Sequence, residues 1–185
     1  TTDNKDGSRT VIVTDEGNAK FQMQLVRDKQ KRRWVVDDVL IRQDGKGGTR
    51  STKSASEVMD LLLTLREFLS TLKSADRSQV LPMTGDELRD PLERLRESWM
   101  QVLLTRITSE YEAEQVRRPE AQLNGTEAVV KLPARHGFML LQIVRRNDEW
   151  LIRDVEVHNR REEVHPGSVR NEARALACVA DFLLT

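Results

Sequence analysis

The sequence predicts an α+β protein in which helices pack on an antiparallel sheet, and three observations lead to this fold class. Apolar residues recur at helical spacing over residues 54–74 and again over residues 91–108. Short alternating stretches separated by turn signals then follow, which is typical of an antiparallel meander. The third observation is an internal repeat, which divides the 185 residues into units of the same kind.

The repeat relates the beginning of the chain to its last third. Asp6–Ile12 matches Asn124–Val130 at an offset of 118 residues, and Trp34–Val39 matches Trp150–Val155 at an offset of 116. At an offset of 114, five apolar positions match in order: Leu61, Leu62, Leu65, Phe68 and Leu69 with Ala175, Leu176, Val179, Phe182 and Leu183. Because the offset changes only where turns would absorb it, the repeating unit is about 115 residues long.

The repeat predicts one complete unit flanked by two incomplete ones. Residues 54–158 form the complete unit, residues 1–50 the C-terminal sheet half of a preceding unit, and residues 168–185 the first helix of a following unit. Since the chain starts at Thr1 and stops inside a helical pattern, we interpret it as a fragment of a longer tandem-repeat protein. We expect the flanking sheet half and the flanking helix to pair with each other, within one chain or between chains.

Local signals place the helices. Ser54-Ala55-Ser56-Glu57 is a capping box and predicts a helix over residues 54–74. Asp90 and Pro91 form a second start signal, for a helix that reaches about residue 108. Ser168 is the expected cap of a last helix over residues 169–184.

Turn signals and alternation place the strands. Asn124-Gly125 is a hairpin signal and precedes strands predicted over residues 126–132, 137–145 and 150–158. The first part of the chain repeats them over residues 10–13, 20–27 and 34–42. Residues 111–116 are weakly strand-like, and Pro119 interrupts them.

This pattern of a long helix, further helices and a sheet whose late strand opens with Trp resembles the nuclear transport factor 2-like superfamily. The resemblance lies in Asn124–Val130, Leu140–Arg145 and Asn147–Val155, and again in Asp6–Ile12, Gln24–Asp28 and Trp34–Val39. It implies cone-shaped α+β units with helices packed on a curved antiparallel sheet. The family includes isomerases, dehydratases, polyketide cyclases, lipid carriers, transport adaptors and non-catalytic modules, so the fold does not select the activity.

Asp154 is the candidate catalytic residue, because the enzymes of this family use Asp, His or Tyr groups that point into the cone. Strand alternation places it on one face with Trp150, Ile152 and Glu156. A carboxylate beside apolar neighbours can act as a general base. The alternative is an Asp that accepts backbone or Arg hydrogen bonds near a sheet end. Its recurrence as Asp38 in the other copy favours this structural role.

The leading hypothesis for function is a non-catalytic repeat module with a scaffold or protein-interaction role, whose partner is another protein or a second copy. Two alternatives stay open. One is binding of a small apolar ligand or lipid in the cone, with five candidate pocket residues: Trp99, Tyr111, Met139, Leu141 and Ile152. The other is an isomerase or dehydratase with Asp154 as base. No set of polar residues repeats a catalytic set of the family, which favours a non-catalytic module over an enzyme and leaves the enzyme as an alternative.

Composition narrows the remaining classes. Thirty basic and thirty acidic residues give zero net charge, which argues against a dedicated nucleic-acid binder. The apolar runs are too short to span a membrane, and a single Cys excludes a multi-cysteine metal site. Two histidines, His158 and His165, and the carboxylates Glu162 and Glu163 are interpreted as a solvated linker, so no metal or cofactor is expected. A cytoplasmic location is expected, with secreted and periplasmic ones left open.

Overall fold

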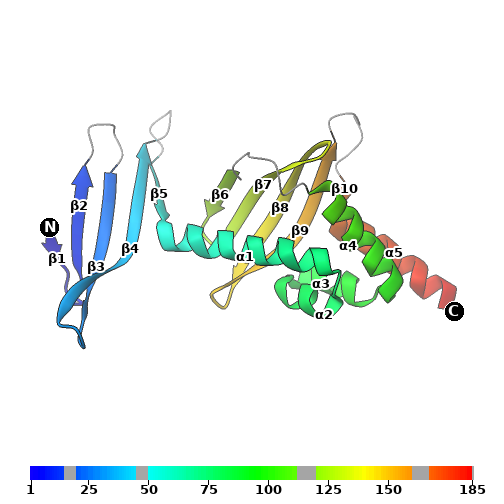
Figure 1. Ribbon diagram of the computed structural model, residues 1–185, viewed down its shortest axis with the longest axis horizontal. Coiled ribbons are helices and arrows are strands. Elements are labelled where there is room, and N and C mark those ends of the chain that lie inside the picture. The colour runs from blue at the N-terminus through cyan, green and yellow to red at the C-terminus, as the bar shows by residue number, and fades with distance from the viewer. Residues whose placement is uncertain (15–19, 45–49, 112–119, 160–166, 185) are drawn as a thin grey trace. The chain divides into compact units, whose positions relative to one another are not determined.

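The structure, a computed structural model, describes residues 1–14, 20–44, 50–111, 120–159 and 167–184 (Figure 1). In these residues the fold is α+β, with two antiparallel sheets and several helices. The chain divides into two compact units, Thr1–Leu63 (unit 1) and Thr64–Thr185 (unit 2). Each unit contains one of the two sheets.

Unit 1 is a sheet whose strands pair in chain order. Its strands are β1 (Thr2–Asp3), β2 (Arg9–Thr14), β3 (Lys20–Asp28), β4 (Arg33–Asp44) and β5 (Arg50–Ser54). All the pairings are antiparallel, as the meander pattern predicts. Helix α1 (Ala55–Ser74) begins directly after β5 and runs on into unit 2.

Unit 2 combines a second meander with helices. Its helical elements are α2 (Arg77–Val80), a 3-10 turn (Leu81–Met83), α3 (Asp86–Glu93), α4 (Glu97–Glu110) and α5 (Val169–Leu184). Its strands are β6 (Glu120–Asn124), β7 (Glu127–Ala134), β8 (Gly137–Arg146), β9 (Glu149–Asn159) and β10 (Gly167–Ser168), paired in this order. Helix α5 packs against α3 and β9.

The core of unit 2 lies between one face of this sheet and the helices. Alternate residues of the central strands are almost fully buried: Val130, Leu132, Met139, Leu141, Ile143 and Ile152. The helices contribute Leu65, Phe68, Leu72, Leu88, Leu92, Met100, Leu104 and Ile107, all no more than 3% exposed. Burial of this much apolar surface is the main stabilising term of the unit.

The first and last predicted helices are confirmed together with their caps. The Ser54 hydroxyl accepts the backbone N–H of Glu57 at 3.1 Å, and the Ser168 hydroxyl accepts that of Asn171 at 3.1 Å. The hairpin at Asn124 is also confirmed, with Gly125 at a φ of +60°. This left-handed conformation favours glycine.

The single helix predicted over residues 91–108 is wrong, because two helices occupy this segment. Pro91 lies inside α3, which starts at Asp86, and α4 starts at Glu97. The Arg77 side chain donates to the carbonyl oxygens of Glu93 and Leu95. These bonds occupy backbone acceptors that a continuous helix would use, so they stabilise the break.

A β-bulge recurs at the same place in both sheets. The register shifts opposite Gln24 and Leu25 in unit 1 and opposite Gln142 and Ile143 in unit 2, which inserts one extra residue in β4 and in β9. The insertion breaks strict alternation. Val155, 1% exposed, therefore joins the core. Ile152 pairs with Ile143, whereas Asp154 pairs with Gln142 and Glu156 with Leu140, so the expectation that Asp154 and Glu156 share a face with Trp150 and Ile152 is wrong.

The first strand of the repeat is also offset by one residue from the sequence match. Val11 pairs with Met23, whereas Val130 pairs with the equivalent Leu141, so Val11 rather than Ile12 takes the place of Val130. The reason is the preceding turn, which runs from Asp3 to Arg9 in unit 1 but only from Asn124 to Glu127 in unit 2.

Candidate functional site

The carboxylate of Asp154 joins the middle of β9 to the start of α5. One oxygen accepts the backbone N–H groups of Val155 at 2.8 Å and Arg170 at 3.0 Å. The other accepts the Ser168 hydroxyl at 2.7 Å and lies 3.6 Å from the Arg170 guanidinium. Asp154 is fully buried, so its charge is compensated by these donors rather than by water.

The same junction is built in unit 1 around Asp38. Its Oδ1 accepts the backbone N–H of Val39 at 2.7 Å and the Ser56 hydroxyl at 2.9 Å. Burial raises the pKa of Asp38, but hydrogen bonds from Ser54, Ser56 and two backbone N–H groups outweigh this effect, so its pKa lies below the ordinary value. The two aspartates therefore share one structural task, which is to fix a helix start against the preceding strand.

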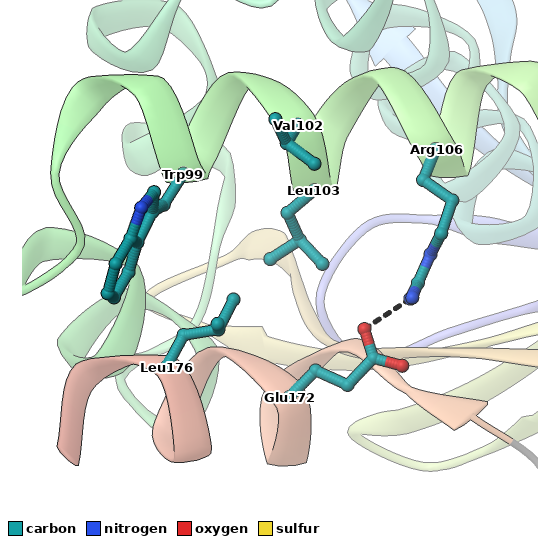
Figure 2. Close-up of a pocket in the computed structure, with 6 residues that line it drawn as sticks. All are labelled: Trp99, Val102, Leu103, Arg106, Glu172 and Leu176. Carbon is teal, nitrogen blue, oxygen red and sulfur yellow. Dashed lines mark hydrogen bonds and ion pairs between the residues drawn. The ribbon is translucent and has the colours of Figure 1, made fainter. Parts of the chain in front are cut away.

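A groove lies between α4 and α5 (Figure 2). Its lining residues are Trp99, Val102, Leu103 and Arg106 from α4, with Glu172 and Leu176 from α5. Its volume is about 190 Å³. Trp99 and Leu176 lie at one end, and the ion pair between Arg106 and Glu172 lies at the other. The lining is mainly apolar, and Val102 is 71% exposed.

Helix spacing explains why α4 lines a groove and the core at once. Met100, Leu103, Leu104 and Ile107 are buried and form its core face. Trp99, Val102 and Arg106 follow at spacings of three and four residues and so form a second stripe beside the first. An apolar surface this wide exceeds the single face that an ordinary surface helix buries.

The structure does not bring the five candidate pocket residues together. Met139, Leu141 and Ile152 are fully buried in the core beneath the helices. Tyr111 is the C-cap of α4, and its backbone N–H donates to the carbonyl oxygen of Ile107. Of the five, Trp99 alone lines the groove described above.

Sequence reasoning missed the other groove residues, although a signal was present. Val102 and Leu103 stand in the same apolar stripe as Trp99, and Leu176 matches Leu62 in the repeat. The periodicity assigned all of them to a core. Only the break between α3 and α4 and the position of α5 show which of them remain near solvent.

Of the histidine and carboxylate candidates His158, Glu162, Glu163 and His165, the structure describes His158 alone. His158 stacks on Phe138 with ring centroids 4.4 Å apart, and its Nε2 lies 3.2 Å from Glu156. Glu162, Glu163 and His165, like the strand-like segment after Tyr111, lie outside the described residues. Within the described ranges, no group of three or more His, Cys, Asp or Glu side chains is placed to hold a metal ion.

Two further findings complete the description of the site. In the part of the chain that the structure describes, no helix has both the length and the apolar character needed to cross a membrane. The sequence matches no protein-family model and no curated protein at a significant level.

Proposed function

We propose that this chain is a non-catalytic α+β repeat module of the nuclear transport factor 2-like kind that binds another protein. The observation that carries the proposal is the exposed apolar groove between α4 and α5, with Trp99 as its anchor. Tryptophan and arginine are enriched where proteins bind one another, and both line this groove. An apolar patch of this kind on a folded unit usually marks an interaction site.

The polar residues support a binding role rather than a reaction. A general base must reach the proton that it removes, within about 3 Å. Asp154 is fully buried and spends both carboxylate oxygens on the start of α5. The corresponding hydrogen bonds around Asp38 hold the start of α1 in unit 1, so a structural role explains why this aspartate recurs.

The groove also favours a protein over a small apolar ligand. Its volume of about 190 Å³ lies below the roughly 300 Å³ at which pockets for drug-sized molecules begin. It is open along the exposed side chain of Val102, which suits a side chain presented by a partner surface. The cone residues Met139, Leu141 and Ile152 are already covered by the protein's own side chains.

Site-specific photo-crosslinking in cells tests the proposal. A photoreactive residue replaces Val102, and in a matched control it replaces the exposed neighbour Gln101. We expect discrete protein adducts from position 102 and at least about tenfold fewer from position 101, because only residue 102 lines the groove. Trp99→Ala should reduce the adducts at position 102.

Equal yields from both positions, or adducts at position 102 that consist of lipid or small molecules, would contradict a protein-binding groove. If the protein converts a small molecule and Asp154→Asn abolishes this turnover, the hypothesis of an enzyme with Asp154 as base would be supported instead. Because the Asn side chain keeps an acceptor for the start of α5, loss of such activity could not be assigned simply to loss of the fold.

A further inference from the structure

The hairpin that joins β3 and β4 in unit 1 carries a concentrated positive charge (Figure 1). Residues 27–33, which we call the basic hairpin, contain five basic side chains and one acidic one: Arg27, Lys29, Lys31, Arg32 and Arg33, with Asp28. All of the basic side chains are exposed. Because like charges this close together repel one another, an anion bound among them lowers the free energy of the folded protein.

Asp28 does not neutralise this charge. Its Oδ1 accepts the backbone N–H groups of Gln30 at 2.9 Å and Lys31 at 3.0 Å, so the carboxylate holds the turn and is directed at the backbone. In the part of the chain that the structure describes, no carboxylate lies within ion-pair distance of the basic side chains of this hairpin. The positive charge is therefore a property of the hairpin itself.

The corresponding hairpin of unit 2 is balanced in charge and holds carboxylates. Arg145 lies 3.5 Å from Asp148 within the turn. Arg146 forms ion pairs with Asp86 and Glu87, two adjacent acidic residues in the first turn of α3. The protein thus contains an example of this end of the sheet bound to neighbouring carboxylates.

We propose that the basic hairpin binds an acidic segment of a partner protein, one with adjacent Asp and Glu residues. This surface is additional to the groove between α4 and α5 and does not depend on it. A guanidinium group can bind a carboxylate through two parallel hydrogen bonds, and the lysine ammonium groups add charge attraction. Because these contacts are exposed, they should govern the rate of association and the choice of partner more than the final affinity.

The observations favour a protein over a nucleic acid or a membrane. Binding of single-stranded nucleic acid uses aromatic side chains among the basic ones, and residues 27–33 contain none. The ring of Trp34, the next residue, already has the Arg9 guanidinium 4.6 Å from its centroid. The hairpin is built from strands, whereas polybasic segments that bind membranes usually lie on an amphipathic helix or beside a membrane span.

Fluorescence anisotropy with the full chain and a labelled acidic peptide tests the proposal. The probe is a peptide of about ten alternating Asp and Glu residues, long enough to reach every basic side chain of the turn. We expect Lys29→Glu/Lys31→Glu to weaken binding at least about tenfold, because it places like charges against the peptide. The matched control is Arg66→Glu/Lys73→Glu, which changes two exposed basic residues of α1 and shifts the net charge equally. It should weaken binding less than about twofold.

A second hairpin variant guards against a change in the fold. Lys29→Gln/Lys31→Gln adds no negative charge and keeps the backbone N–H of Lys31 that Asp28 accepts. It should weaken binding at least about threefold, since exposed ion pairs contribute up to about 1 kcal/mol each. Raising the salt concentration from about 50 mM to about 200 mM should weaken wild-type binding and have little effect on the residual binding of both hairpin variants.

Two probes that carry phosphate in place of carboxylate separate the other classes of partner. They are a single-stranded oligonucleotide of about ten nucleotides and vesicles of phosphatidylcholine with about 30% phosphatidylserine. We expect both to bind more weakly than the peptide. If either binds more tightly and Lys29→Glu/Lys31→Glu abolishes that binding, the basic hairpin belongs to that class and the proposal is overturned. Absence of peptide binding at about 100 μM, or equal losses in hairpin and control variants, would also overturn it.

The groove and the basic hairpin can fail separately. Trp99→Ala should leave the peptide affinity unchanged within about twofold, because Trp99 lines the groove and not the hairpin. If the photoreactive residue at position 102 captures no protein while the hairpin binds the peptide, the groove is excluded and the hairpin site stands. The opposite pair of results leaves the groove and excludes the hairpin site.

Discussion

Units 1 and 2 contain closely similar sheets, yet among the residues that the structure describes only unit 2 has a substantial core. Trp34 is 38% exposed while its counterpart Trp150 is 5% exposed, and Val36 is 54% exposed while Ile152 is fully buried. Strand order, the β-bulge and the capping aspartate are the same in both. The difference shows that the sequence of each meander specifies its sheet locally, whereas burial of the sheet face depends on the helices that pack on it.

Helices α1 and α5, which match each other in sequence, also differ in which apolar side chains they bury. The stripe that α5 buries, with Ala173 and Ala177 fully covered, corresponds to Met59 and Leu63 of α1, which are 57% and 53% exposed. Leu65 and Phe68, which α1 buries in unit 2, correspond to Val179 and Phe182 of α5, which are 49% and 80% exposed. The two helices therefore bury different ones of their matching apolar positions.

The largest expected effect separates the two helices. Phe68→Ala should lower the free energy of unfolding by about 4 kcal/mol, because it leaves a cavity in the core. Phe182→Ala, at the matching position, should change it by less than about 0.5 kcal/mol in the monomer. Chemical denaturation of both variants at low protein concentration measures the difference. Similar losses would show that the two positions are equally packed and would break the comparison.

The next effect separates the two capping aspartates. Asp154→Ala should lower the free energy of unfolding by about 3 kcal/mol, because it removes a fully buried carboxylate and leaves the Arg170 guanidinium and several donors without their partner. Asp38→Ala should lower it by about 1 kcal/mol, the usual loss for a helix cap. Denaturation followed by circular dichroism tests the order. A larger loss for Asp38→Ala would reverse it.

The smallest effect concerns pH. Since the pKa of Asp38 in the folded protein is below its ordinary value of 3.8, its charge stabilises the fold fully above that value. The contribution is lost as the pH falls through the lowered pKa. Asp38→Asn keeps an acceptor but no charge, so it should be less stable than wild type at pH 7, and the difference should disappear as the pH falls through the lowered pKa of Asp38. A stability difference that persists at the acidic end would contradict this assignment, and the titration of the Asp38 carboxyl carbon by NMR gives the pKa directly.

Much of this architecture follows from local signals. The capping serines, the Asn124 hairpin and the main strands depend on a few neighbouring residues, and these predictions are confirmed. The break after α3 depends on Arg77, eighteen positions before the Leu95 carbonyl group that it binds, so periodicity alone did not reveal it. The bulge that moves Glu156 away from the core also depends on strand pairing rather than on sequence pattern.

The candidate site was harder to predict from the sequence, because it too depends on contacts between residues that are far apart along the chain. Trp99 was selected as a large aromatic residue, but the other side of its groove is formed by Glu172 and Leu176 of α5, more than seventy positions away. Asp154 was selected as a carboxylate among apolar residues. Its role depends on the Ser168 and Arg170 donors, which only the chain reversal after β9 brings within bonding distance. Composition shows which side chains the protein contains, but the role of each one depends on the residues that it contacts in the folded structure.

The position of α1 across the unit boundary has a further consequence for how such a protein can be divided. Residues up to Leu63 belong to unit 1, and those from Thr64 belong to unit 2, yet one continuous helix carries both. A cut after Ser54 removes the residues that Asp38 caps, and a cut after Ser74 removes Phe68 and Leu72 from the second core. Neither excised part retains all of its native contacts. In an array of such units, melting of one unit would therefore weaken its neighbour, and the stability of the whole would exceed the sum of isolated pieces.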